Sequence, residues 1–90
     1  MGDYPAARPY LEQALAINCE ALGEKHPDTA SSLNNLGYLL SAMGDYTAAR
    51  PCYEQALAIC KEALGEKHPT TRIVQNNLAL LEAQTSQSDH

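Results

Sequence analysis

The chain of 90 residues contains no tryptophan and no phenylalanine, and only six Lys and Arg residues stand against eleven Asp and Glu residues. Nucleic-acid surfaces need clustered positive charge, so the formal net charge of −5 predicts that nucleic acid is not a partner. No apolar run approaches the roughly 20 residues of a membrane span, and no charged segment followed by an apolar core opens the chain. We therefore expect a cytoplasmic protein without a membrane partner.

The sequence also lacks the patterns of metal, cofactor and catalytic sites. Cys19, Cys52 and Cys60 are odd in number, whereas disulfide frameworks and zinc sites need recurring, closely spaced ligands. We expect reduced cysteines within helices, with a free reactive thiol as the alternative. His26 and His68 each precede a proline, which suits a local hydrogen bond to the next helix. We predict no enzyme, no cofactor and no metal site, because no oxyanion hole or glycine-rich phosphate loop is evident.

What the chain does contain is one sequence written twice. Residues 1–42 align with residues 43–84 without a gap, and 27 of the 42 aligned positions are identical. A fixed period of this size is typical of a repeat array, in which each unit buries its apolar face against its neighbour. Fold and function are therefore interpreted repeat by repeat.

Apolar residues recur at intervals of three and four, which predicts helices throughout the chain. Asp45 is expected to cap the start of the helix over residues 46–64, Gly65 is expected to end that helix, and Gly23 is expected to end the helix over residues 4–22. The expected helices cover residues 4–22, 27–43, 46–64 and 70–84, with residues 85–90 as a polar tail. Because the connections are short, neighbouring helices should run antiparallel.

One group of small and large residues carries a resemblance to a known family: Leu33, Leu36, Gly37, Leu40, Gly44, Tyr46, Ala49, Tyr53, Ala56 and Leu57. This pattern resembles the tetratricopeptide repeat, whose usual length is about 34 residues. The longer period here, with Leu-Gly-Glu-Lys-His-Pro in each linker, is similar to the kinesin light chain group of these repeats. The resemblance implies an all-α fold, an α-α superhelix (TPR-like solenoid) of four antiparallel helices. Their order is B-A-B-A, where A and B are the first and second helix of a repeat.

The resemblance further implies that the A helices form a concave wall that binds an extended peptide or protein partner. The positions that match the peptide-binding face are Ser31, Asn34 and Tyr38 in one repeat and Ile73, Asn76 and Leu80 in the other. Asparagine carries two donors and an acceptor, so it can pair with the main chain of an extended peptide. The alternative is that the asparagines pair within the array, and we favour that role for Asn35 and Asn77.

The two ends of the array differ in their expected roles. Gln75 and Glu82 align with Leu33 and Leu40, and a polar face suits a terminal capping helix, so residues 70–84 are predicted to be a C-terminal cap. The helix over residues 4–22 has no A helix before it. We expect it to expose an apolar stripe to solvent or to another molecule, made of Ala7, Leu11, Ala14 and Leu15.

The sequence thus predicts a non-enzymatic scaffold that binds a peptide on the A-helix face. The alternative is a module that self-associates through residues 4–22. Gln75 and Glu82 would oppose a head-to-tail contact, so a two-fold homodimer is the favoured form of this alternative.

Overall fold

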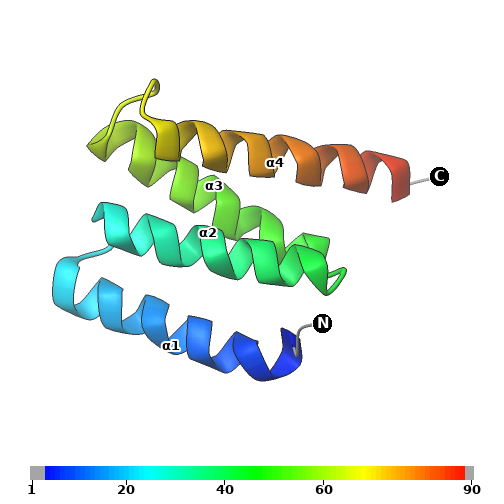
Figure 1. Ribbon diagram of the computed structural model, residues 1–90, viewed down its shortest axis with the longest axis horizontal. Helices are drawn as coiled ribbons and strands as arrows, with labels where there is room; N and C mark the ends of the chain where they lie inside the picture. Colours follow the sequence, from blue (N-terminus) through cyan, green and yellow to red (C-terminus); the bar gives the residue numbers. More distant parts are fainter. Residues whose placement is uncertain (1–3, 89–90) are drawn as a thin grey trace.

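The computed structural model describes residues 4–88, and this part of the chain forms four α-helices and no strand. The helices are α1 (Tyr4–Leu22), α2 (Pro27–Ala42), α3 (Tyr46–Ala63) and α4 (Pro69–Ser88). Consecutive helices run antiparallel and follow one another in chain order across the molecule (Figure 1). The predicted all-α fold is confirmed. None of the helices in the described chain combines the length and apolar character that crossing a membrane requires.

Capping residues explain where the helices begin and end. Oδ1 of Asp45 accepts a hydrogen bond from the backbone N–H of Ala48 at 3.3 Å, which satisfies one free donor in the first turn of α3. Gly23 and Gly65 follow the ends of α1 and α3 with φ angles of 102° and 93°. Glycine adopts this left-handed conformation without a steric penalty, and it ends a helix. The structure confirms these three caps.

The last helix is longer than the sequence analysis expects. It spans Pro69–Ser88 rather than residues 70–84, so four of the residues assigned to a polar tail at 85–90 are helical. Residues 89 and 90 lie outside the described residues. This segment contains neither glycine nor proline, so nothing stops the helix. The Thr85 hydroxyl also donates to the Glu82 carbonyl at 3.0 Å. The helices α2 and α3 each end one residue earlier than predicted.

Both repeated histidines make the local hydrogen bond that the sequence predicts. Nδ1 of His26 accepts from the backbone N–H of Asp28 at 3.0 Å, and Nδ1 of His68 accepts from that of Thr70 at 3.1 Å. Each bond satisfies a donor in the first turn of a helix, where the chain otherwise leaves N–H groups unpaired. The two histidines therefore fix the start of α2 and of α4.

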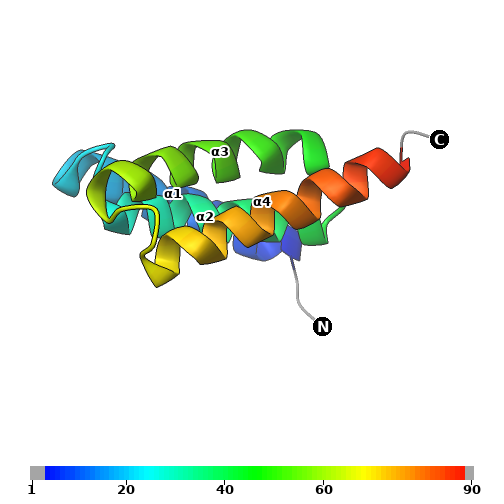
Figure 2. The same cartoon turned by 90° about the horizontal axis from the view of Figure 1, so that it is seen from above.

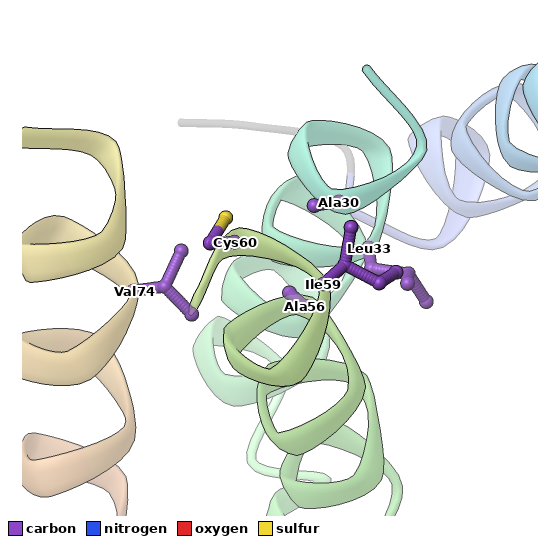
Figure 3. Close-up of a cluster of buried hydrophobic side chains, with 6 residues drawn as sticks. All are labelled: Ala30, Leu33, Ala56, Ile59, Cys60 and Val74. Carbon is purple, nitrogen blue, oxygen red and sulfur yellow. The ribbon is translucent and has the colours of Figure 1, made fainter. Parts of the chain in front are cut away.

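The centre of the core is α3, which packs against α2 on one side and α4 on the other. In one cluster, Ile59 lies toward Leu33 of α2 while Cys60 lies toward Val74 of α4 (Figure 3). A second cluster surrounds Tyr53, which is only 2% exposed. The buried apolar residues are Ala30, Leu33, Leu36, Leu39, Leu40, Ala49, Tyr53, Ala56, Ile59, Cys60, Val74 and Leu81.

A glycine lets α2 and α3 approach each other closely. A Cβ atom built on Gly37 would lie 2.9 Å from Cε1 of the Tyr53 ring, which is closer than real Cβ contacts. The aligned residue on α4 is Ala79, which is exposed because no helix covers that side of α4 in the described chain. The small residue is thus needed where a helix pair forms.

Candidate functional site

The predicted peptide-binding residues lie along one face shared by α2 and α4. Figure 2 shows α3 along one side of the molecule and α4 along the other, with α2 behind them. We call the exposed surface of the two A helices the groove face, and define it by the six predicted residues Ser31, Asn34, Tyr38, Ile73, Asn76 and Leu80.

Large apolar side chains are exposed at matching positions of this face. Tyr38 is 64% exposed on α2, and the aligned Leu80 is 63% exposed on α4. Ile73 is 54% exposed one helical repeat earlier, and Ser31 is its exposed counterpart. Residues seven apart share one face of a helix, while the leucines of α2 that bind α3 occupy the other face. The face therefore presents apolar groups that the fold itself does not use.

The asparagines do not behave as two equivalent pairs. Nδ2 of Asn77 donates to Oδ1 of Asn34 at 3.0 Å, which links α4 to α2. Asn34 and Asn77 are half-buried, whereas Asn35 and Asn76 are exposed. The structural role favoured for Asn77 is thus present, and it also engages Asn34, which the sequence analysis assigns to the peptide. Asn76 remains the groove asparagine whose amide faces solvent.

A depression of about 110 Å³ opens on the groove face between α2 and α4. It lies between Tyr38 and Leu80, and its inner wall includes the buried side chains of Tyr53 and Leu81. The complete lining is Tyr38, Ser41, Tyr53, Asn77, Leu80, Leu81 and Gln84. This volume is several times the 10–15 Å³, roughly, that one water needs. The depression is therefore large enough to receive a side chain.

The polar atoms at this depression are held in an apolar setting. Burial raises the pKa of the Tyr53 phenol, the Ser41 hydroxyl beside it opposes this rise, and Tyr38 and Cys52 add to it. Oγ of Ser41 is itself buried and has no partner with hydrogen-bond geometry among the described residues.

A larger hollow of about 530 Å³ lies beside the start of α3, but its Arg50 and Glu54 already pair with each other, and its Asp45 caps α3. Nε of Arg50 lies 3.1 Å from the Glu54 carboxylate, and its Nη2 lies 3.2 Å from that of Glu82. The hollow is open to solvent along Gly44 and Thr47. We therefore regard the groove face as the better candidate site.

The side of α4 that no described helix covers is polar. Gln75 and Glu82 are exposed where the aligned Leu33 and Leu40 of α2 are buried against α3. Glu82 also accepts a hydrogen bond from Arg50 of α3. The sequence predicts a polar side chain there but not its partner, which depends on the packing angle between α3 and α4.

The predicted self-association stripe on α1 is wrong for three of its four residues, which are not fully exposed. Leu11 and Leu15 are half-buried, because they pack against the core clusters between α1, α2 and α3. Ala7 is half-buried as well, and Ala14 alone of the four is exposed. The prediction left these residues to solvent or to another molecule, whereas α1 uses the face with Leu11 and Leu15 to pack on the core.

The exposed apolar residues of α1 lie on a different face. Tyr10 is 74% exposed and Ile17 is 55% exposed, and the exposed Ala14 lies between them at helical spacing. We call these three residues the α1 stripe. The residues of α3 that align with Ala14 and Ile17 are Ala56 and Ile59, both buried. Alignment of the two B helices was the signal that could have identified this stripe.

The cysteines are free and show no feature of an activated nucleophile. Burial raises the pKa of the Cys60 thiol, and it also raises that of Cys52, where nearby Arg8 opposes the rise and Glu12 adds to it. A raised pKa leaves less of the reactive thiolate at neutral pH. Within residues 4–88, no group of three or more His, Cys, Asp or Glu side chains is arranged to hold a metal ion.

Comparison with known proteins agrees with this architecture. The pattern described as Tetratricopeptide repeat matches residues 1–62 and, in a second register, residues 29–90. No curated protein matches the chain. Repeats of this kind generally mediate protein–protein interaction and form a non-catalytic module. The two overlapping matches together cover the whole sequence, and the chain belongs to the tetratricopeptide repeat family.

Proposed function

We propose that this chain is a scaffold that binds an extended segment of a protein partner on the groove face. The observation that carries the proposal is the matched exposure of Tyr38 on α2 and Leu80 on α4 at aligned positions. Covering the exposed part of each side chain would contribute about 1 kcal/mol of binding free energy. The exposed amide of Asn76 supplies hydrogen bonds to the main chain of the ligand.

Three features support proposals about the repeat subtype, the cell compartment and the kind of partner. The period of 42 residues supports assignment of the repeats to the longer, kinesin light chain-like form. Three free cysteines suit a reducing compartment such as the cytoplasm. The net charge of −5 disfavours nucleic acid as a partner.

A display library of random peptides, selected on the immobilised protein, tests the proposal. We expect enriched peptides whose dissociation constants rise at least about tenfold for Leu80→Lys, because a charge replaces an apolar contact. Leu80 is mostly exposed, so this variant should fold, and circular dichroism would verify that. The matched control is Ile17→Lys, an equivalent change on α1, which should leave peptide binding unchanged. Enrichment of peptides that bind both variants equally well would rule out the groove face.

The α1 stripe favours a second candidate function, which is self-association. Ile17 is exposed, while the aligned Ile59 is covered by α2, so a helix of a second copy could cover the same kind of surface. The outer side of α4 carries Gln75 and Glu82 and is a poor match for an apolar stripe. A two-fold pairing of α1 with α1 of a second copy is therefore the form we propose.

Light scattering after size exclusion measures this association directly. A two-fold dimer would show twice the monomer mass of 9.7 kDa. Ile17→Lys should restore the monomer mass, because two lysines would face each other across the two-fold axis. Here Leu80→Lys is the matched control and should keep the dimer. A wild-type mass of 9.7 kDa at every concentration would exclude self-association.

A further inference from the structure

The two A helices start with a different capping chemistry from α3. Oδ1 of Asp45 caps α3 by accepting a hydrogen bond from the N–H of Ala48. The starts of α2 and α4 are instead held by Nδ1 of His26 and Nδ1 of His68. Histidine is the side chain whose charge ordinarily changes between about pH 5 and about pH 8, whereas an aspartate carboxylate stays ionised over this range. Acid can therefore act on the caps of the A helices without acting on the cap of α3.

The direction of these two hydrogen bonds fixes the protonation state of each histidine. A backbone N–H can only donate, so Nδ1 must offer its lone pair, and the neutral imidazole carries its proton on Nε2. A proton taken from solvent forms a new N–H bond at that lone pair, and the N–H groups of Asp28 and Thr70 then lose their acceptor. The helix macrodipole also disfavours a positive charge at this end of a helix. Protonation and capping therefore exclude each other at both histidines.

Both histidines have charged neighbours of both signs, but neither histidine forms an ion pair within residues 4–88. Glu62 of α3 borders the same hollow as the linker that precedes α2. The charged neighbours of the first histidine are Glu24, Lys25, Asp28 and Glu62, and those of the second are Glu66 and Lys67. No carboxylate is bonded to either imidazole, so nothing in the described chain replaces the cap once the proton is bound.

We infer that His26 and His68 form a proton-sensitive device, in which acid releases the first turns of α2 and α4 together while α3 keeps its cap. Ser31 and Ile73 of the groove face lie in the second turns of these two helices. The device thus acts at the same end of both A helices, and its consequence for a bound segment rests on the proposed function. The release itself does not, because both bonds belong to the free chain.

NMR of the free protein at about pH 7.5 and about pH 5 tests the device, since histidine changes its charge between these values. The nitrogen chemical shifts of the imidazoles report which nitrogen carries the proton, and both histidines should carry it on Nε2 at the higher pH. Exchange of backbone amides with water reports the caps. We expect the protection of the Asp28 and Thr70 amides to fall about fivefold at the lower pH, the effect of losing an N-cap. The Ala48 amide is the internal reference and should keep its protection.

Two asparagine variants assign the response to the histidines. Asparagine is a good N-cap whose side-chain oxygen accepts the same kind of hydrogen bond and does not titrate. His26→Asn should make the protection of the Asp28 amide independent of pH, while the Thr70 amide continues to respond. His68→Asn should do the reverse, so each variant is the matched control for the other. The double variant should show no response at either amide.

The inference is overturned if Nδ1 carries the proton at the higher pH, or if the protection of the two amides does not fall in acid. An equal fall in the asparagine variants would also overturn it, because acid would then act elsewhere. No peptide enters this experiment, so its failure is separate from that of the proposed function. Library peptides that depend on Leu80 would retain the function even where the caps ignore pH.

Discussion

The two B-to-A junctions of this molecule have nearly the same sequence but use different chemistry. At the first junction, Asn18 of α1 donates to Oγ of Ser32 on α2 at 2.6 Å. At the second, the aligned residues are Cys60 of α3 and Val74 of α4, which pack as buried apolar groups. The Asn18–Ser32 bond is part-buried, whereas Cys60 and Val74 are at most 1% exposed and belong to a core cluster that includes Ala30 of α2. The same backbone arrangement thus accepts a polar pair near solvent and an apolar pair inside the core.

The largest expected difference in stability between the repeats comes from substituting the aligned isoleucines. Ile59→Ala should lower the free energy of unfolding by about 2–5 kcal/mol, because Ile59 is only 6% exposed and its removal leaves a cavity. Ile17→Ala should change it by less than about 0.5 kcal/mol, since Ile17 is exposed. Urea unfolding followed by circular dichroism measures both. Equal losses would mean that α1 is covered in solution, which the dimer proposal predicts only at high protein concentration.

A smaller effect is expected where small residues stand in the A helices. Gly37→Ala should destabilise the fold by about 1–3 kcal/mol, because its methyl group would press on the Tyr53 ring. The reverse change at the aligned position, Ala79→Gly, should cost about 1 kcal/mol through helix propensity alone. Combining Gly37→Ala with Tyr53→Leu, the residue type of the first repeat, provides the control. Relief of the loss in this double variant would identify the ring contact as its cause.

This comparison also shows what the sequence can predict. The repeat, its caps and its apolar spacing are local signals, so the four helices follow from them, whereas the assignment of Tyr38, Ile73 and Leu80 to one face comes from the resemblance to the tetratricopeptide repeat. The bond between Asn34 and Asn77 does not, because it depends on how α4 is rotated relative to α2. Two residues that differ by one position in the repeat meet across helices, and no spacing within one repeat indicates that.

The error on α1 has a related physical cause. A B helix packs on the A helix of its own repeat and also on the A helix of the next, so it has two apolar faces. For α1, only one of these neighbours lies among the described residues, and helical periodicity alone does not say which face that neighbour covers. Leu11 and Leu15 pack on the core that remains, and Tyr10 and Ile17 are left exposed. The burial of Ile59 in the other repeat resolves the choice.

The aligned threonines should give effects of opposite sign, each of about 1 kcal/mol. The Thr29 hydroxyl donates to the Gly23 carbonyl at 2.7 Å, so Thr29→Val should destabilise the fold by losing this bond. The Thr71 hydroxyl is buried without a hydrogen-bond partner in the described chain, so Thr71→Val should stabilise it. Shifts of the urea unfolding midpoint would measure both changes, provided that the dependence of the free energy of unfolding on urea concentration is the same in each variant. A loss of stability in Thr71→Val would show that this hydroxyl has a partner, such as a bound water.

The smallest expected effect is a pH dependence of the free energy of unfolding that arises at the second junction. This junction holds a thiol where the first junction holds an amide. Burial raises the pKa of Cys60 above its usual 9.0, so the folded protein keeps this proton when the unfolded chain has lost it. Its contribution to stability is complete below about pH 9 and declines as the pH rises further. The decline is a fraction of the roughly 1.4 kcal/mol per pH unit that one full proton gives. Unfolding measured on both sides of pH 9 should therefore show a smaller decline in Cys60→Ala than in the wild type.

Tyr53 and Cys52, whose pKa values burial also raises, account for the remaining decline in that variant. The control is Cys19→Ala, which removes a half-buried thiol of α1. An unchanged decline of the free energy of unfolding in Cys60→Ala would mean that water reaches the second junction as readily as the first.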